Sequence, residues 1–94
     1  MTFRDNTAQQ RLEWSENGYI AYASYRLADS RLTIPHVEAA VPLRGTGAAG
    51  RLMEAVIAHA RKQNLKIVPL CSYAVAWFKR HPEAGDVLAS DDRR

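Results

Sequence analysis

Apolar and polar residues alternate along the first half of the chain with the period of a β-strand. Side chains of a strand point to opposite faces in turn, so this alternation predicts strands that are buried on one face. Three such segments occur, at residues 10–15, 19–27 and 31–41. Asn17-Gly18 separates the first two and is the dipeptide most typical of a two-residue hairpin turn. We therefore expect three or four antiparallel strands joined by short turns.

The third of these segments contains Pro35 and is followed directly by Pro42. Regular alternation along it would place five side chains on one face, those of Leu32, Ile34, His36, Glu38 and Ala40. Proline has no amide hydrogen to donate to a neighbouring strand. We therefore expect the segment to be bulged or interrupted near Pro35 and Pro42, or to have its prolines at unpaired positions.

The second half of the chain changes to helical spacing. Apolar residues recur every three or four positions from Ala49 to Ala60, which predicts a helix that ends near Asn64. Residues 66–70 form a short apolar run, which predicts a buried strand.

A second, shorter helix is predicted at residues 73–80. Ser72 can cap its start, and Pro82 ends it because the residue before a proline disfavours helical conformation. The expected order of elements is ββββ-α-β-α. A right-handed crossover then places the strand of Ile67 parallel to the strand of Thr33 in the same sheet.

Length and composition indicate a single soluble domain. The chain has 94 residues, of which 47% are hydrophobic and 24% charged, and this suits one folded core. Its longest uncharged run, residues 67–78, is far shorter than the ~20 apolar residues that span a bilayer. The polar N-terminus does not resemble a signal peptide. We expect one cytoplasmic domain over residues 1–94, without a membrane partner and with a loosely ordered tail at residues 84–94.

Charge and cysteine content exclude further classes of protein. The net charge of +3 is spread along the chain and is not gathered in a basic patch, so we expect no nucleic-acid partner. Cys71 is the only cysteine, which excludes an internal disulfide and a cysteine-rich zinc module, and we expect no bound metal.

Three glycines and several small residues lie between the third strand segment and the long helix. This segment reads Arg44-Gly45-Thr46-Gly47-Ala48-Ala49-Gly50, and we call residues 44–50 the glycine loop. Small residues at a helix N-terminus let backbone amides approach a ligand, and the unpaired N–H groups and the helix dipole there favour a phosphate. A plain strand-to-helix turn is the alternative, but the number of glycines and the flanking arginine favour an anion site.

Two common phosphate-binding motifs do not fit this loop. Gly45, Gly47 and Gly50 match G-x-G-x-x-G, but the dinucleotide-binding form opens a βαβ unit and needs an acidic residue about 20 positions later. Here the loop lies in the middle of the chain, and residues 65–70 contain no acidic residue. A Walker loop requires Gly-Lys-Ser/Thr, whereas Gly50 is followed by Arg51.

A third phosphate-binding motif does fit. Arg44-x-x-Gly47-x-Ala49 resembles the Arg/Gln-x-x-Gly-x-Gly/Ala pyrophosphate loop of the GNAT acetyltransferase superfamily, which also lies between a strand and a helix. The small, single-domain YjdJ-like branch of these N-acetyltransferases has further motifs in the order found here: His36-x-Glu38, Val68-Pro69-Leu70-Cys71-Ser72-Tyr73 and Arg80-His81-Pro82-Glu83. The resemblance covers nearly the whole chain. It implies a GNAT-like α/β (α+β) fold with a mixed, mainly antiparallel sheet, a long helix after the fourth strand and a short C-terminal helix.

The resemblance also implies acetyl-CoA as cofactor and an amine as acceptor. Residues 44–49 of the glycine loop would hold the pyrophosphate, and the pantetheine arm would pair with the strand near residues 38–41, where two strands splay apart. The cofactor-binding residues implied in this way are Ala39, Ala40, Val41, Arg44, Gly45, Thr46, Gly47, Ala48, Ala49, Cys71 and Ser72. Because the chain lacks the extra C-terminal strands of larger GNAT enzymes, we expect an open acceptor side. Such a site suits a lysine side chain, a protein terminus or a small amine.

Three residues are candidates for catalysis. Either His36 or Glu38 could deprotonate the attacking amine, since only the neutral amine is nucleophilic. Glu38 is favoured, because a partly buried carboxylate can have a raised pKa. Cys71 lies where a strand meets a helix N-terminus, which favours the thiolate. It could accept the acetyl group first, contact the thioester, or be a small buried hydrophobic residue.

One position departs from the pattern of the branch. Many members have at the position of Trp77 a tyrosine that protonates the departing CoA thiolate, and an indole cannot do so. Tyr73, one turn away, is a candidate substitute.

The alternative function is a module that binds CoA or acyl-CoA without turnover. We expect a monomer or weak homodimer, and a core that includes Trp14, Tyr22 and Trp77.

Overall fold

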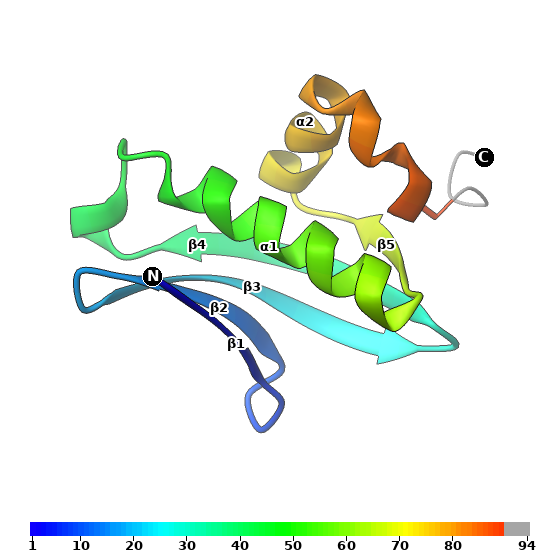
Figure 1. Cartoon of the computed structure of the whole chain (residues 1–94), viewed down its shortest axis with the longest axis horizontal. Coiled ribbons are helices and arrows are strands. Elements are labelled where there is room, and N and C mark those ends of the chain that lie inside the picture. Colours follow the sequence, from blue (N-terminus) through cyan, green and yellow to red (C-terminus); the bar gives the residue numbers. More distant parts are fainter. Residues whose placement is uncertain (90–94) are drawn as a thin grey trace.

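A five-stranded sheet forms one layer of the molecule, and two helices cover one of its faces (Figure 1). The computed structural model describes residues 1–89. The strands lie side by side in chain order: β1 (Thr2–Asn6), β2 (Arg11–Glu16), β3 (Tyr19–Ala28), β4 (Arg31–Ala39) and β5 (Lys66–Pro69). Neighbours from β1 to β4 are antiparallel, and β5 is parallel to β4. The predicted fold class and the parallel crossover are thus confirmed.

The β2–β3 hairpin turns at Asn17 and Gly18, as predicted. Their φ angles are +52° and +79°, the left-handed pair that a tight hairpin turn requires. β1 is a strand that the alternation does not reveal. It has a mostly polar sequence, in which Phe3 packs against the core and has its ring centroid 5.5 Å from that of His59.

α1 (Ala48–Gln63) lies across the inner face of the sheet. Its buried residues recur at helical spacing: Ala48, Leu52, Met53, Val56, Ile57 and Ala60. They pack against inward side chains of the strands, including Leu12, Ala23 and Ile34. The helix ends as predicted at Asn64, which has a left-handed φ of +58° and donates its amide to carbonyls of the last turn.

α2 (Ser72–Arg80) packs beside α1 on the same side of the sheet (Figure 1). Its N-cap is Cys71, whose Sγ accepts the Ala74 amide at 3.4 Å. The cap predicted at Ser72 is therefore displaced by one residue, because the extended φ and ψ that a cap requires occur at Cys71. No helix within residues 1–89 has the length and apolar character needed to cross a membrane.

The residues that follow α2 are packed against the rest of the molecule. η2 (Pro82–Val87) is a 3₁₀ turn that buries Ala84 and Val87. Ala89 then donates its amide to the carbonyl of Ile67 at 2.9 Å. The expectation of a loosely ordered segment is wrong for residues 84–89, because these small apolar side chains complete the core. Residues 90–94 lie outside the described part of the chain.

β4 contains a bulge at Ile34 and Pro35, in agreement with the predicted irregularity. Between Thr33 and His36 two residues of β4 oppose one residue of β3. The extra residue reverses the alternation of faces: Ile34 is buried beneath the helices, whereas His36 and Glu38 lie on the opposite, exposed face. The expectation that these three side chains share one face is therefore wrong.

Two of the three aromatic residues expected in the core are found there. Trp77 is buried and stacks on the ring of His81, with centroids 4.0 Å apart, and Trp14 is partly buried against the core. Tyr22 instead lies on the exposed face, where the guanidinium of Arg11 lies 4.4 Å from its ring centroid. The small neighbours of Tyr22 in β3 take the inward positions beneath α1.

Candidate functional site

The glycine loop connects β4 to α1 after a short 3₁₀ turn, η1 (Val41–Leu43). Gly45 and Gly47 have φ angles of +78° and +87°, which residues with a side chain rarely adopt. Gly47 is also the N-cap of α1. The loop therefore presents backbone groups at the helix N-terminus.

Thr46 organises the loop through its side chain. Its Oγ1 donates to the carbonyl of Leu43 at 2.6 Å and accepts the amide of Ala48 at 3.3 Å. The amides of Ala49 and Gly50 follow in the first helical turn, where a helix offers no carbonyl partner. These amides, at the positive end of the helix dipole, suit the binding of a phosphate group.

The loop borders a pocket of about 310 Å³. Its lining consists of Ala39, Leu43, Arg44, Gly45, Gly47, Ala48, Ala49, Gly50 and Tyr73. Arg44 is exposed, brings positive charge to the rim and donates its Nε to the carbonyl of Ala39 at 3.1 Å. Tyr73 comes from α2, and burial raises the pKa of its phenol, which is therefore protonated at neutral pH.

β4 and β5 separate next to this pocket. They pair only from Arg31 to Ile34 on the β4 side, while β4 continues to Ala39. The carbonyl of Ile34 marks the point of separation, where it accepts the amides of Leu70 and Cys71 at 3.0 and 3.3 Å. A gap between the strands therefore opens at the start of α2.

The separated half of β4 directs backbone groups into this gap. The amide of Ala40 donates to the carbonyl of Ile20 in β3 at 3.1 Å. Backbone groups of alternate residues point to opposite sides of a strand, so Glu38 also pairs with β3, whereas Val37 and Ala39 face the β5 side. An extended ligand in the gap can pair with these groups as an added strand would.

Six of the predicted cofactor residues line the pocket together: Ala39, Arg44, Gly45, Gly47, Ala48 and Ala49. The carbonyls of Ala40 and Val41 instead accept amides within and after turn η1, at 2.8 and 3.1 Å. Thr46 bonds within the loop, and Cys71 and Ser72 lie at the start of α2, outside the lining.

Three lining residues were not among the predicted cofactor residues. Leu43 and Gly50 flank the predicted motif. Gly50 could have been included from the sequence, because it is a small residue directly after the motif in the first turn of the helix. Tyr73 comes from another element, and only its place in the tertiary structure brings it to the loop, with its hydroxyl 3.9 Å from the position of a Cβ on Gly50.

His36 and Glu38 form a hydrogen-bonded pair on the exposed face of β4. His36 Nε2 lies 2.8 Å from Glu38 Oε1, and the two side chains are 55% and 48% exposed. The hydrogen bond from His36 lowers the pKa of Glu38. The expectation of a raised pKa at Glu38 is wrong, because the carboxylate is not buried and has a hydrogen-bonding partner.

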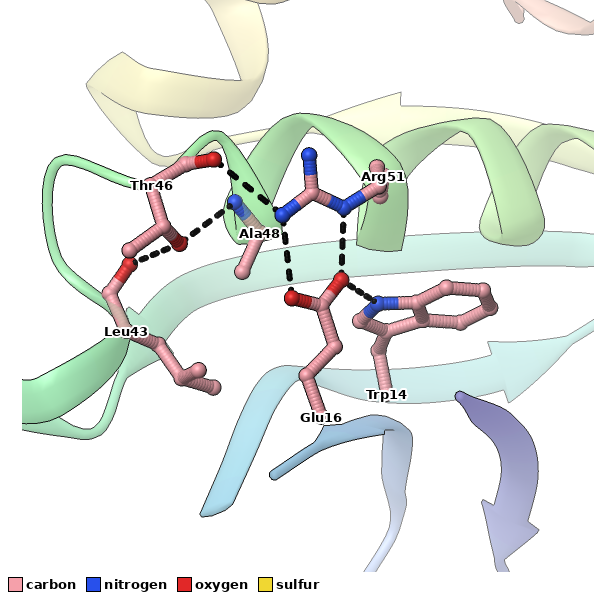
Figure 2. Close-up of polar contacts among 6 residues, drawn as sticks. All are labelled: Trp14, Glu16, Leu43, Thr46, Ala48 and Arg51. Atoms are coloured by element: carbon pink, nitrogen blue, oxygen red, sulfur yellow. Dashed lines mark hydrogen bonds and ion pairs between the residues drawn. The ribbon is translucent and has the colours of Figure 1, made fainter. Parts of the chain in front are cut away.

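A charged network connects β2 to the glycine loop (Figure 2). Glu16 accepts the Nε and Nη2 of Arg51 at 2.5 and 2.9 Å, and the Nε1 of Trp14 at 2.6 Å. Nη2 of Arg51 also donates to the carbonyl of Thr46 at 3.1 Å. The Glu16 side chain is only 6% exposed, and its hydrogen bonds from Arg51 and Trp14 lower its pKa to about 2. In the sequence, Glu16 is an ordinary polar residue before a turn.

The sequence model of GCN5-related N-acetyltransferases matches residues 10–87, from the start of β2 to the end of η2. The chain belongs to the GCN5-related N-acetyltransferase family. The predicted family is thereby confirmed, and the match includes both the glycine loop and the gap between β4 and β5.

A solved structure of similar fold supports this assignment. It is the NMR solution structure of a GCN5-like protein from Staphylococcus aureus, described there as a proposed N-acetyltransferase. The two chains are 28% identical and superpose with a TM-score of 0.71 over 94% of this chain and 87% of the other. The comparison with curated proteins gives no match.

Enzymes of the GCN5-related family generally transfer an acetyl group from acetyl-CoA to an amine, and membership assigns the chain to the acetyltransferases. The glycine loop lies between β4 and α1, the position at which the sequence predicts a pyrophosphate loop.

Proposed function

We propose that the protein transfers an acetyl group from acetyl-CoA to an exposed amine, with the CoA pyrophosphate bound on the glycine loop. The observation that carries this proposal is the pocket at the N-terminus of α1. Amides of the first helical turn and the guanidinium of Arg44 border it, and both favour an anion. The left-handed glycines leave the backbone accessible for close approach by a phosphate.

The gap between β4 and β5 suits the pantetheine arm. It begins beside the pocket at Ala39 and ends at the Ile34 carbonyl, where Cys71 begins α2. The arm carries amide groups that can pair with the backbone of Val37 and with the amide of Ala39, whose carbonyl accepts a hydrogen bond from Arg44. This arrangement would place the thioester near the bulge of β4.

Proton removal from the acceptor is assigned to His36, oriented by Glu38. Because its pKa is lowered, the Glu38 carboxylate is a poor proton acceptor at neutral pH, but it accepts a hydrogen bond from His36 Nε2. With the ring hydrogen on Nε2, the Nδ1 lone pair is left to take a proton from the amine. The pair lies on an exposed sheet face, which suits an amine presented by a protein or a small molecule.

The departing thiolate requires a proton, which we assign to Tyr73. The amine nitrogen attacks the thioester carbonyl, the C–S bond breaks, and the thiolate takes the phenolic proton. Tyr73 is protonated at neutral pH, and its hydroxyl lies beside Gly50 at the glycine-loop end of the pocket, so this role requires its side chain to turn towards the thioester. Trp77, which stands where the branch often has tyrosine, is only 4% exposed and has no part in the site.

Activity of matched variants tests the assignment of the base. With acetyl-CoA and a panel of lysine peptides and small amines, we expect the wild type to release CoA thiol and form acetylated amine. His36→Gln should lower kcat by about a hundredfold or more, the typical contribution of a general base. Glu38→Gln should lower it less, because the imidazole remains. A larger loss in Glu38→Gln than in His36→Gln would make Glu38 the base.

Direct transfer is proposed over transfer through Cys71, because its sulfur is already engaged as the cap of α2. Intact-mass analysis after incubation with acetyl-CoA alone should therefore show no acetyl adduct on the wild type. Cys71→Ser keeps a cap residue and should retain transfer. An adduct that is present in the wild type and missing in Cys71→Ser, together with loss of transfer in that variant, would establish the covalent route.

A CoA-binding module without turnover is the second candidate, and it is motivated by Trp77, a buried indole that cannot protonate a thiolate. It predicts binding of CoA with no transfer to any amine of the panel, and no change of that outcome in His36→Gln.

A further inference from the structure

Two similar charged contacts hold the ends of α1. At its C-terminal end, Arg61 donates to both carboxylate oxygens of Asp86, at 2.9 and 2.8 Å, and to the carbonyl of Glu83 at 3.2 Å. At its N-terminal end, Arg51 makes the same kind of two-pronged contact with Glu16. Both arginines therefore anchor the helix to another part of the chain.

The contact of Arg51 differs in what else it reaches. Its Nη2 donates to the carbonyl of Thr46 inside the glycine loop, as Figure 2 shows. Its Nη1 lies 3.1 Å from the position that a Cβ on Gly47 would take. The guanidinium thus lies directly against the peptide unit between Thr46 and Gly47.

The orientation of this peptide unit determines where one loop amide points. In a trans peptide the carbonyl of Thr46 and the N–H of Gly47 point in opposite directions. With the carbonyl held by Arg51, the N–H of Gly47 is directed away from the guanidinium. The flanking glycines have left-handed φ angles and the conformational freedom to let such a unit turn over, so a fixed contact is needed to hold it.

We propose that Glu16 and Arg51 are positioning residues that hold the Thr46–Gly47 peptide in the orientation in which the Gly47 amide can bind the CoA pyrophosphate. Glu16 fixes the guanidinium by two hydrogen bonds, and Trp14 fixes Glu16 in turn. The hairpin of β2 and β3 therefore sets the geometry of a loop more than 25 residues away in the chain, counted from Glu16 to Arg44. This inference rests on the proposed site for CoA.

The sign of one effect separates positioning from simple electrostatics. Glu16 is a negative charge near a site for an anion, so its removal alone should tighten CoA binding. If Glu16 instead positions the loop through Arg51, Glu16→Gln should weaken binding by about tenfold, the equivalent of one charge-assisted hydrogen bond. Asp86→Asn is the matched control, because it changes the same kind of contact at the other end of α1.

The experiment is a titration of ¹⁵N-labelled protein followed by amide NMR, with CoA and with pantetheine, which lacks the phosphates. We expect Glu16→Gln to lose affinity for CoA and to bind pantetheine as the wild type does, with a shifted Gly47 resonance. Asp86→Asn should bind both ligands normally. A general structural defect would instead weaken both ligands, and tighter or unchanged CoA binding in Glu16→Gln would overturn the proposal.

A milder variant decides the case if Glu16→Gln does not fold. Trp14→Phe removes the indole hydrogen bond to Glu16 while keeping an aromatic ring against the core, and it should weaken CoA binding in the same direction by a smaller factor. Unchanged CoA affinity in a folded Trp14→Phe would then count against the proposal. If the wild type itself binds no CoA, the proposed function fails first, which distinguishes the two failures.

Discussion

At the residue scale, Glu16 illustrates how a single carboxylate can connect two parts of the fold. It lies at the end of β2, almost fully buried, and bonds to Arg51 of α1 and to Trp14 of its own strand. A buried carboxylate remains ionised only when it is paired and hydrogen-bonded, and Arg51 and Trp14 provide these contacts to Glu16. Its lowered pKa has a measurable consequence for acid stability.

We predict that Glu16→Gln reduces the loss of stability in acid. The pKa of Glu16 is about 2 in the folded chain, against an ordinary value of 4.5, so the unfolded chain binds more protons between these values. The stabilisation is therefore complete above pH 4.5 and is lost as the pH falls towards 2. Urea unfolding at a series of pH values should show a shallower decline for the variant. Glu54→Gln, on the exposed side of α1, is the control, and a decline in Glu16→Gln as steep as in the wild type would contradict the account.

The sequence identified some residues of the site and missed others for a physical reason. Gly45 and Gly47 could be found because glycine itself signals an unusual backbone. Glu16 could not, since its role depends on a contact with a helix 35 positions later. The raised pKa expected for Glu38 failed for a similar reason, because burial is a property of the folded chain.

At the scale of single elements, the bulge in β4 connects the fold to the site. One extra residue beside Pro35 reverses the alternation and puts His36 on the exposed face. The proline predicted an irregularity but not its type, and alternation alone cannot show where the count of residues shifts. The bulge also coincides with the end of pairing between β4 and β5 at Ile34.

We predict that deletion of Pro35 keeps the fold and weakens CoA binding by about tenfold or more, since misplacement of binding groups is costly. Deletion would leave Ile34 opposite Tyr25 and His36 opposite Ser24, so every side chain keeps its face. The strand would lose its bend, and pairing with β5 could continue across the gap. Calorimetry with CoA gives the affinity, and Pro35→Ala, which keeps the extra residue, should bind normally. Unchanged affinity in a folded deletion variant would show that the bulge does not open the gap.

At the scale of the whole molecule, the sequence predicted the order of the strands and helices well, but it did not locate the edge strand β1 or the turn η2. Strong alternation, helical spacing and the handedness of the crossover led to the sheet, both helices and the parallel β5. The positions of the edge strand β1 and of the turn η2 were not recognised, because both have short, mixed sequences; β1 gains its order from pairing with β2, and η2 from packing against α1 and α2. The glycine loop lies where three of the predicted elements meet, and this is why its position could be anticipated.

The central claim is that the glycine loop binds CoA, and calorimetric titration of two matched glycine variants tests it most directly. Gly45 and Gly18 have φ angles of +78° and +79°, and neither has an atom within 4 Å of the position of a Cβ. Gly45→Glu and Gly18→Glu therefore impose the same backbone strain, one on the loop and one on the β2–β3 turn. The account predicts that CoA binds the wild type and Gly18→Glu equally and does not bind Gly45→Glu, whose carboxylate opposes the pyrophosphate. Equal affinity in both variants, or no binding to a folded wild type, would contradict it.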